Sequence, residues 1–368
     1  MRIGMIAPPW VAVPPRGYGG TEAVVDNLAR GLQARGHEVR LFTVGESTCP
    51  VPRAFLYPNA VAPMGTTAAE AAHALAAYEA LDDVDVIHDH TSVGPLLAPA
   101  AGARRAPIVI THHGAFTFEF RRIMAAIAHR ASIVAISHNQ ADSAPEVPIS
   151  AVIHHGIDLD MYRAGPGDGG YLLFVGRMSA DKGIDRAIRV ARASERRLVI
   201  ATKVREPEER DFFDRVVRPL LGPDVEVWIE PALPARLEMF RHATALVNPI
   251  TWPEPFGLVM AEALASGTPV LAFSWGAAPE IVDDGITGHL CIDEAEMVGK
   301  VDGLDRLDRR ACRAAAEARF SLERMTGDYE RVYRDALTRA ARSGHTSSGE
   351  GLGPGEVPCP DLPTTLAV

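Results

Sequence analysis

Two cations bounded by glycines follow an apolar run in the segment GRMSADKG, residues Gly176–Gly183. If that run is a parallel strand, Arg177 and Lys182 lie at its carboxyl end, where α/β proteins bind ligands. Fixed positive charge there would stabilise the negative charge that builds on a diphosphate as a sugar–oxygen bond breaks. A solvated Arg and Lys on a surface loop is the alternative, and this segment taken alone favours it.

A pair of glutamates frames an expected helix in EPFGLVMAEALASGTPV, residues Glu254–Val270. We expect Pro255 to set the start of the helix and Leu258–Ala265 to propagate it. Glu254 would then lie beside the exposed N–H groups of the helix start and could bind a sugar hydroxyl near a bound phosphate. Glu262 follows about two turns later and could reach ribose hydroxyls deeper in a cleft. Glutamates at this spacing are common on solvated helices, but the Phe-Gly turn and the small-residue exit make this segment more specific.

A glycine-rich loop, GYGGTE at Gly17–Glu22, separates the first expected strand from the first expected helix. Its glycines would let the backbone approach a ligand, and Thr21 could cap a helix whose first N–H groups face an anion. A plain turn explains the loop equally well. The full G-x-G-x-x-G pattern is missing, which argues against a nicotinamide-dinucleotide site.

Four histidines lie at the ends of two expected strands of the first half: His88 and His90 in VIHDHTS, and His112 and His113 in ITHHG. Both groups could face one cleft. A metal site is one interpretation, but no carboxylate or cysteine set completes the ligand spacing. We expect instead that one of these histidines handles a proton or binds a hydroxyl.

Other metal-like patterns in the chain carry little weight. The D-x-D pairs Asp83/Asp85 and Asp158/Asp160 precede a strand or fall at a linker, where chance matches are expected in so acidic a chain. The four cysteines are far apart and form no C-x-x-C pair, which argues against a disulfide framework and a structural zinc site.

Short β-rich runs alternate with amphipathic stretches, which is typical of stacked βαβ units. The pattern breaks over Asp158–Gly170, where RAGPGDGG has the composition of an interdomain linker, and then restarts. We therefore expect an α/β protein with two Rossmann-like parallel-sheet domains that face a cleft. The expected strands are Arg2–Ala7, Glu38–Val44, Val84–His88, Pro107–Thr111, Ser132–Ser137, Tyr171–Val175, Arg197–Ala201, Val225–Ile229, Ala245–Asn248 and Pro269–Phe273.

The expected division of the chain has four parts. Met325, Tyr329, Val332 and Tyr333 fall on one side of a helix near the end, so this face should be packed. The last stretch is rich in Gly, Pro, Ser and Thr and lacks the apolar content to fold. The parts are 1–160 for the first domain, 161–320 for the second, 321–342 for the last helix and 343–368 for a disordered tail.

The composition of the 368 residues is that of a globular protein. A net charge of −10 argues against a general nucleic-acid-binding protein. The sequence has no stretch long enough for a membrane span and no recognisable signal peptide. We expect a cytoplasmic protein, and its many Ala and Arg residues suggest a bacterial source with a GC-rich genome.

The ordered motifs GYGGTE, ITHHG, VIHHGIDLD, GRMSADKG, EPFGLVMAEALASGTPV and APEIVDDGITG resemble those of glycosyltransferase family 4. The resemblance covers about Met1 to Tyr333. It implies a retaining enzyme of the GT-B fold that needs no metal or other cofactor, with the last helix crossing back to the first domain. The donor would be a nucleoside diphosphate sugar.

The resemblance also implies roles for matching positions. His113, Arg177, Lys182 and Glu254 would act on the donor sugar and the diphosphate. The remaining donor-binding positions would be Gly19, Gly20, Thr21, Phe256, Gly257, Leu258, Val259 and Glu262.

Three positions depart from the family's usual pattern. His155 stands where the family often has Asn, and Thr202 and Ile229 stand where it often has Gly, near the expected site of the base. We favour a UDP-sugar, with a GDP-sugar as the alternative.

Other functions stay open at this point. A sugar-nucleotide epimerase or hydrolase of the same fold, or a non-catalytic sugar-nucleotide-binding protein, would share these motifs. The acceptor could be a small molecule, a glycan or a lipid, and the oligomeric state is undetermined. The stretch Phe118–Arg130 could hold the protein at the inner membrane face, although a helix docked on the first domain explains it more simply.

Overall fold

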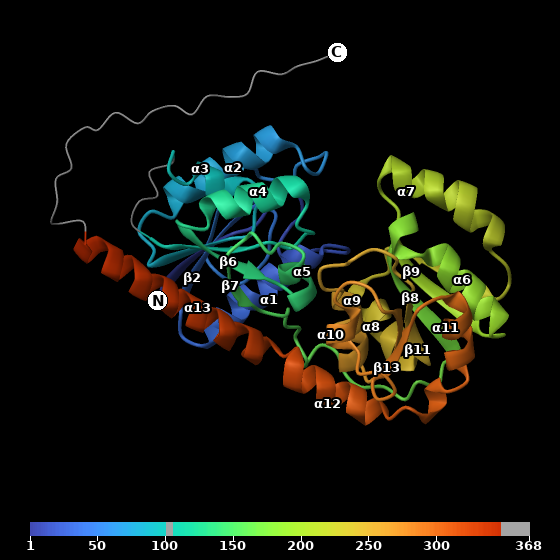
Figure 1. The fold of residues 1–368 in the computed structure, drawn as a ribbon. Coiled ribbons are helices and arrows are strands. Elements are labelled where there is room, and N and C mark those ends of the chain that lie inside the picture. The colour runs from blue at the N-terminus through green and yellow to red at the C-terminus, as the bar shows by residue number, and fades with distance from the viewer. Residues whose placement is uncertain (101–105, 347–368) are drawn as a thin grey trace, which may run out of the picture.

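Two parallel β-sheets form the two halves of the molecule in the computed structural model, which describes residues 1–100 and 106–346 (Figure 1). The strand order is β3-β2-β1-β4-β5-β6-β7 in the first sheet and β10-β9-β8-β11-β12-β13 in the second, and all neighbours pair in parallel. The expected α/β architecture with two sheets is confirmed. The strands are β1 (Arg2–Ile6), β2 (Glu38–Thr43), β3 (Arg53–Phe55), β4 (Val86–Asp89), β5 (Ile108–Thr111), β6 (Ala131–Ala135), β7 (Ile149–Val152), β8 (Tyr171–Arg177), β9 (Arg197–Lys203), β10 (Val225–Ile229), β11 (Ala245–Asn248), β12 (Val270–Phe273) and β13 (Gly288–Cys291).

The central strands are apolar runs because both faces of each sheet are covered. Strands β4, β5, β11 and β12 are buried at every residue, as expected for parallel strands between helical layers. All ten expected strands are present, with ends that differ by up to two residues. Three edge strands were missed: β3 and β7 are short and partly or fully exposed, and β13 begins with a glycine.

Helices cover the sheets on both sides (Figure 1). In α1, Val24, Leu28 and Leu32 are buried, and the chain leaves the helix through Gly36 at φ +84°. The helices are α1 (Gly20–Ala34), α2 (Thr67–Ala80), α3 (Gly94–Leu97), α4 (Phe118–Ile127), α5 (His138–Asp142), α6 (Ile184–Ala193), α7 (Pro207–Phe212), α8 (Leu233–His242), α9 (Leu258–Ala265), α10 (Ala278–Ile281), α11 (Glu294–Val301), α12 (Arg309–Arg319) and α13 (Leu322–Thr346).

The last helix, α13, belongs to the first half of the molecule in space although it follows the second half in sequence (Figure 1). Its Met325, Tyr329, Val332 and Tyr333 are buried in the same core as α1 and β1. The predicted crossover is therefore confirmed. The helix runs to Thr346, past the expected boundary at 342. The rest of the expected tail, 347–368, lies outside the described residues.

The segment between β7 and β8 links the two halves, which we call the first and second domains. It contains no strand, as its composition predicts, although Arg313 of α12 donates hydrogen bonds to the carbonyls of Leu159 and Tyr162 and so holds it against the second domain. The exact domain limits stay a prediction. Among the described residues, no helix combines the length and the apolar character that crossing a membrane requires.

Each sheet has a point where the strand order reverses direction. In the first sheet this point lies between β1 and β4, and in the second between β8 and β11. Loops at the carboxyl ends of such strands diverge and leave a crevice for ligands. The glycine loop, the histidines of VIHDHTS and ITHHG, the two cations and Glu254 lie at the ends of these strands or of their direct neighbours, whereas His155 follows the edge strand β7.

Candidate active site

Lys182 and Glu254 form an ion pair at the carboxyl ends of β8 and β11. Lys182 ends a short turn after β8 and is buried, and its Nζ donates to Glu254 Oε1. The second carboxylate oxygen, Oε2, is buried without a hydrogen-bond partner among the described residues. Because an unpaired buried oxygen is costly, this atom is placed to accept a hydrogen bond from a ligand.

The backbone around Glu254 explains where α9 begins. Gly257 has a φ of +90°, and a methyl group there would lie 2.6 Å from Met260 Cε and 3.3 Å from Glu254 Oε2. The left-handed residue must precede the helix, so α9 starts at Leu258 and the expectation that Pro255 starts it was wrong. The Glu254 carboxylate still lies against the start of the helix, as expected.

Arg177 closes strand β8 and lies partly exposed, with Nη2 donating to Asp181 Oδ2 over 3.2 Å. The hydroxyl of Tyr18, from the first domain, lies close to it. Burial raises the pKa of this hydroxyl, while the neighbouring Lys182 and Arg177 act to lower it. The cations of the second domain therefore face the glycine loop of the first.

The glycine loop caps α1 without a side chain. Gly19 is the N-cap and its carbonyl accepts from Ala23 N, whereas Thr21 is the second residue of the helix. The prediction that Thr21 caps α1 was wrong, because the helix begins at Gly20 and its N-cap is Gly19. A methyl group on Gly20 would lie 3.5 Å from Leu258 Cδ1, so two segments expected to bind the donor meet across the cleft.

Four histidines of the first domain form a row in which each ring contacts the next. Ring centroids lie 4.0 Å apart for His88 and His90, 5.1 Å for His90 and His113, and 5.1 Å for His113 and His155. His90 Nδ1 and His113 Nε2 share a hydrogen bond of 2.9 Å. Burial lowers the pKa of all four, in the case of His155 to about 3. They are therefore neutral at ordinary pH and act as hydrogen-bonding groups.

His112 does not belong to this row. Its Nε2 bonds the carbonyl oxygen of Ala115 at 3.1 Å, and its ring packs on Phe116 and Phe120 at 4.9 and 4.6 Å. The two adjacent histidines thus point to different surroundings, as the extended strand before them predicts.

Glu262 lies in the second turn of α9, where its Oε1 accepts a hydrogen bond of 2.6 Å from the Tyr162 hydroxyl. Arg236 of α8 is nearby. Although burial opposes it, the charge of Glu262 and the hydroxyl of Tyr162 hold the pKa of Arg236 above its ordinary value. Arg236 Nε is buried without a partner among the described residues.

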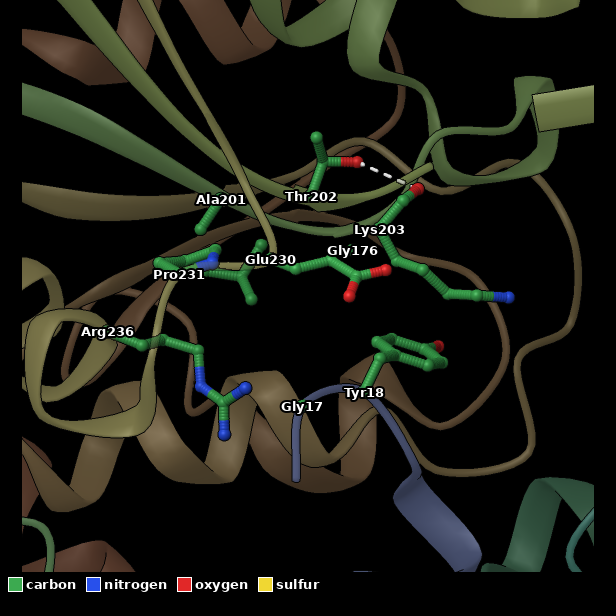
Figure 2. A pocket seen from close by; sticks show the side chains of 10 residues that line it. Gly17, Tyr18, Gly176, Ala201, Thr202, Lys203, Glu230, Pro231 and Arg236 are labelled. Atoms are coloured by element: carbon green, nitrogen blue, oxygen red, sulfur yellow. Dashed lines mark hydrogen bonds between the residues drawn. The ribbon is translucent and has the colours of Figure 1, made fainter. Parts of the chain in front are cut away.

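A pocket lies at the carboxyl ends of β8, β9 and β10, closed from the other domain by Gly17 and Tyr18 (Figure 2). Arg236 points into it from one side and Tyr18 lies on the other. Thr202 is part of its lining, whereas Ile229 is 54% exposed and does not line it. Tyr18, which lines the pocket, also interacts with Arg177 and Lys182.

The other residues of the donor-binding prediction surround the start of α9. Phe256 is buried against His155 and Phe320, so only its backbone can face a ligand. Leu258 and Val259 are partly buried and pack against the core of the second domain.

Sequence reasoning missed Tyr18, Glu22 and Arg236. Tyr18 and Glu22 stand inside the quoted GYGGTE motif, so their positions were in view, but only the tertiary structure shows that Glu22 is buried and that Tyr18 crosses the cleft. Arg236 belongs to a helix with no motif of its own, and nothing in its sequence context marks it.

Three aspartates of the D-x-D pairs bind arginines of the fold. Asp85 bonds Arg2, Asp83 pairs with Arg40, and Asp158 pairs with Arg30. Among the described residues, no group of three or more His, Cys, Asp or Glu side chains has the arrangement of a metal site.

Two family profiles match the chain in succession. One described as "Glycosyltransferase Family 4" matches residues 18–161, and one described as "Glycosyl transferases group 1" matches residues 163–318. Together they span most of the chain, and each contains the motifs of one side of the cleft.

Curated relatives carry the same type of name. The D-inositol 3-phosphate glycosyltransferase of Mycolicibacterium smegmatis is 28% identical over 90% of this chain and 90% of its own length. The Mycobacterium leprae protein of that name is also 28% identical, over 87% of this chain and 89% of its own.

Solved structures share the two-domain fold. AviGT4, a glycosyltransferase involved in avilamycin A biosynthesis, is 26% identical, with a TM-score of 0.70 over 92% of this chain and 98% of its own. Anabaena HepE in complex with UDP and glucose has a TM-score of 0.73 and is 18% identical, over 90% of this chain and 99% of its own. Sucrose-phosphate synthase from Thermosynechococcus elongatus has a TM-score of 0.78 and is 20% identical, over 92% of this chain and 99% of its own. With both profiles matched in order around a cleft of this geometry, the chain belongs to glycosyltransferase family 4 and is a glycosyltransferase of the GT-B fold.

Proposed function

We propose that the protein transfers a sugar from a UDP-sugar to an acceptor hydroxyl, with retention of configuration and without a metal. The single observation that carries this proposal is the Lys182–Glu254 pair at the start of α9, with Glu254 Oε2 buried and unpaired. A sugar hydroxyl at Oε2 would give that oxygen its missing donor. The same sugar would carry its diphosphate towards Lys182 and the helix N-terminus.

The cations would serve the leaving group. As the bond between the sugar and the diphosphate breaks, negative charge grows on the β-phosphate. Lys182 is buried, so its charge acts at reduced dielectric, and Arg177 lies beside it at the end of β8. Gly19, Gly20 and Thr21 would approach the phosphates from the opposite domain, and the start of α9 at Gly257, Leu258 and Val259 would complete the pocket.

His113 would bind a hydroxyl of the donor sugar rather than carry a proton. Its pKa is lowered well below the ordinary value by burial, so the ring is neutral. One ring nitrogen is engaged with His90, which fixes the ring and leaves the other for the sugar.

The base pocket favours UDP. Thr202 occupies room that a glycine would leave open, which disfavours a purine, and Arg236 offers N–H donors that match the carbonyl oxygens of uracil. Glu262, held by Tyr162, would bind the ribose. HepE, which shares this fold, was crystallised with UDP and glucose.

Thermal shift measurements against UDP-, GDP-, ADP- and dTDP-sugars test the donor, because a ligand that binds only the folded state raises its melting temperature. We expect selective stabilisation by a UDP-sugar. Stabilisation by GDP-sugars alone would overturn the assignment of the base. Nuclear magnetic resonance of the product would show whether the anomeric configuration is retained.

Variants at the cations test the chemistry. Arg177→Ala and Lys182→Ala should each lower turnover on the order of 10²-fold or more, by analogy with the loss of one oxyanion donor. Arg189→Ala, which removes a surface cation of the same domain, is the control. Normal turnover in both site variants would remove these residues from the mechanism.

Chelation separates this mechanism from a metal-dependent one. Because side-chain cations and a helix start stand at the diphosphate position, activity should survive EDTA. Activity that is lost to EDTA and restored by Mg²⁺ or Mn²⁺ would contradict the proposal. An epimerase would change the donor sugar without an acceptor, and a binding protein would show no turnover.

A further inference from the structure

A second pocket adjoins the donor pocket on the first-domain side of Tyr18. Its walls come from Trp10 after β1, Glu46 after β2 and Ala60 after β3, with Arg205 of the second domain at its rim. Tyr18 lines both pockets. A molecule in the second pocket would therefore be separated from the donor by one side chain.

Hydrogen bonds between loops build this pocket before any ligand binds. Val61 N donates to the carbonyl of Pro9 at 2.9 Å, and Thr48 N donates to the carbonyl of Val13 at 2.8 Å. The loops after β1, β2 and β3 are thus tied to one another. A tied set of loops loses little conformational entropy when a ligand binds.

Glu46 is fixed by hydrogen bonds from both its backbone and its side chain. Its backbone N–H donates to the carbonyl of Pro58 at 2.8 Å, and its Oε1 accepts from Ala60 N at 2.8 Å. Its Oε2 lies 3.6 Å from Arg16 Nη2, which is longer than a hydrogen bond. One carboxylate oxygen and the exposed guanidinium are therefore both available to a ligand.

Each arginine that lines this pocket has a carboxylate beside it. Arg16 faces Glu46, and Arg205 binds Glu230, which lies outside the lining, through two hydrogen bonds of 2.5 and 2.8 Å. A pocket for a phosphorylated ligand would offer positive charge without such partners, and Glu46 would repel such a ligand. The arrangement instead offers donors and acceptors side by side, which vicinal hydroxyls can engage together.

Trp10 gives the second pocket an apolar surface beside these polar groups. It is partly exposed on the wall of the pocket beside Val11 and Ala12. A large aromatic face next to polar rim groups suits a ring with C–H groups on its face and hydroxyls at its edge.

We infer that this pocket is the acceptor subsite and that the acceptor presents to it a neutral polyhydroxylated ring, such as a sugar or a cyclitol. Trp10 contacts the face of the ring, and Glu46 and Arg16 bind its hydroxyls. The inference rests on the proposed function, since it names the substrate that receives the sugar.

The experiment uses two readouts on the full chain. Saturation-transfer nuclear magnetic resonance in the presence of UDP measures binding of methyl α-D-glucoside and of myo-inositol. UDP release from the preferred UDP-sugar, with and without these compounds, measures transfer. The same measurements with inositol 3-phosphate and glucose 6-phosphate, the anionic arm of the experiment, test phosphorylated acceptors.

We expect a neutral compound to bind and to accelerate UDP release. Trp10→Ala should raise its KM on the order of tenfold, the effect of losing one aromatic contact. UDP affinity and UDP release without acceptor should not change. Trp228→Ala, at an exposed tryptophan that lines neither pocket, is the control.

Glu46→Gln separates the two charge classes. It should raise the KM for the neutral acceptor, whereas at an anion site removal of the negative charge would lower the KM for a phosphorylated acceptor. Three results would overturn the inference: no binding by the neutral compounds, a preference for the anionic arm, or unchanged KM in Trp10→Ala. Failure of the wild type to bind UDP would count against the proposed function instead, and the binding readout without UDP would still test the pocket.

Discussion

Three glutamates around the cleft differ in what surrounds each carboxylate. Glu254 has Lys182 on one oxygen and an unpaired second oxygen, whereas Glu262 accepts from the Tyr162 hydroxyl. Glu22, in the first turn of α1, is buried with no ion-pair partner among the residues that the structure describes, and burial raises its pKa to about 7. Residue type is the same in all three, so the surroundings decide what each carboxylate can bind and make Glu22 harder to ionise.

The pKa of Glu22 predicts a pH-dependent stability. The carboxyl keeps its proton in the folded protein up to about pH 7, but loses it near its usual value of 4.5 in the unfolded chain. The unfolded state therefore binds fewer protons over this range, and the stability present at low pH is lost as pH rises towards 7. Glu22→Gln removes this loss, so the variant should gain up to about 3 kcal/mol over the wild type between about pH 5 and pH 8. Urea unfolding at pH 5 and pH 8 measures the difference in unfolding free energy between the variant and the wild type. An equal difference at the two pH values would mean that Glu22 ionises normally.

The adjacent histidines His112 and His113 offer a matched pair of variants. His113→Ala should leave UDP affinity nearly unchanged and lower turnover on the order of 10²-fold, because a contact to the sugar counts most near the transition state. His112→Ala should instead cost about 1–3 kcal/mol of stability, since it removes the packing on Phe116 and Phe120. Calorimetry with UDP and turnover measured side by side separate the cases. Loss of turnover in His112→Ala alone would reverse the assignment.

At the scale of elements, the strand ends of the first domain are held from behind by α13. Tyr333 bonds His88 Nδ1 at 2.8 Å, and Thr111 bonds both His88 Nε2 and the Tyr329 hydroxyl at 2.8 Å. The helix at the end of the chain thus fixes the base of the histidine row. This contact explains why the packed face of α13 carries two tyrosines rather than only aliphatic residues.

Removing one of these hydroxyls should weaken the docking of α13. Tyr333→Phe leaves His88 Nδ1 buried without its partner, so unfolding free energy should fall by about 1–3 kcal/mol. Tyr57→Phe is the control, because its hydroxyl donates a long hydrogen bond of 3.5 Å to the carbonyl of Ala69. Chemical denaturation compares the two. Equal, small losses in both variants would show that the Tyr333 hydroxyl contributes little to docking.

At the scale of the whole molecule, Glu280 of α10 connects the two domains. Its carboxylate accepts from His138 N at 2.8 Å and Asn139 N at 2.7 Å, at the start of α5, and contacts His154 Nε2 at 2.7 Å. Burial acts against the charge, yet these hydrogen bonds hold the pKa of Glu280 below its ordinary value. The charged side chain thus sets how the domains face each other beside the cleft.

Glu280→Gln should loosen this connection. The amide cannot accept at both positions, so one backbone N–H of α5 loses its partner. We expect a larger radius of gyration by small-angle X-ray scattering and a KM for the UDP-sugar raised on the order of tenfold, because the two halves of the site are less well aligned. Glu294→Gln, at a surface pair with Arg189 inside the second domain, is the control. An unchanged radius and KM would show that other contacts fix the domains.

The sequence by itself determined the two sheets and the membership in the family. The buried strands are apolar along their length, and the helices carry one apolar face, so periodicity alone locates them. The cations after β8 and the glutamate before α9 were also predictable, because strand ends and helix starts are marked by Gly and Pro. Edge strands such as β3 were not, since a short exposed strand has no apolar pattern.

Only the tertiary structure decided which of these groups meet. Lys182 and Glu254 are far apart in sequence and adjacent in space, and Tyr18 reaches them from the other domain. Local rules predicted Thr21 as an N-cap and Pro255 as the start of a helix, but Gly19 and Gly257 take the positions before the helices. Burial, charge neighbours and contacts across the cleft depend on long-range packing, and no local pattern encodes them.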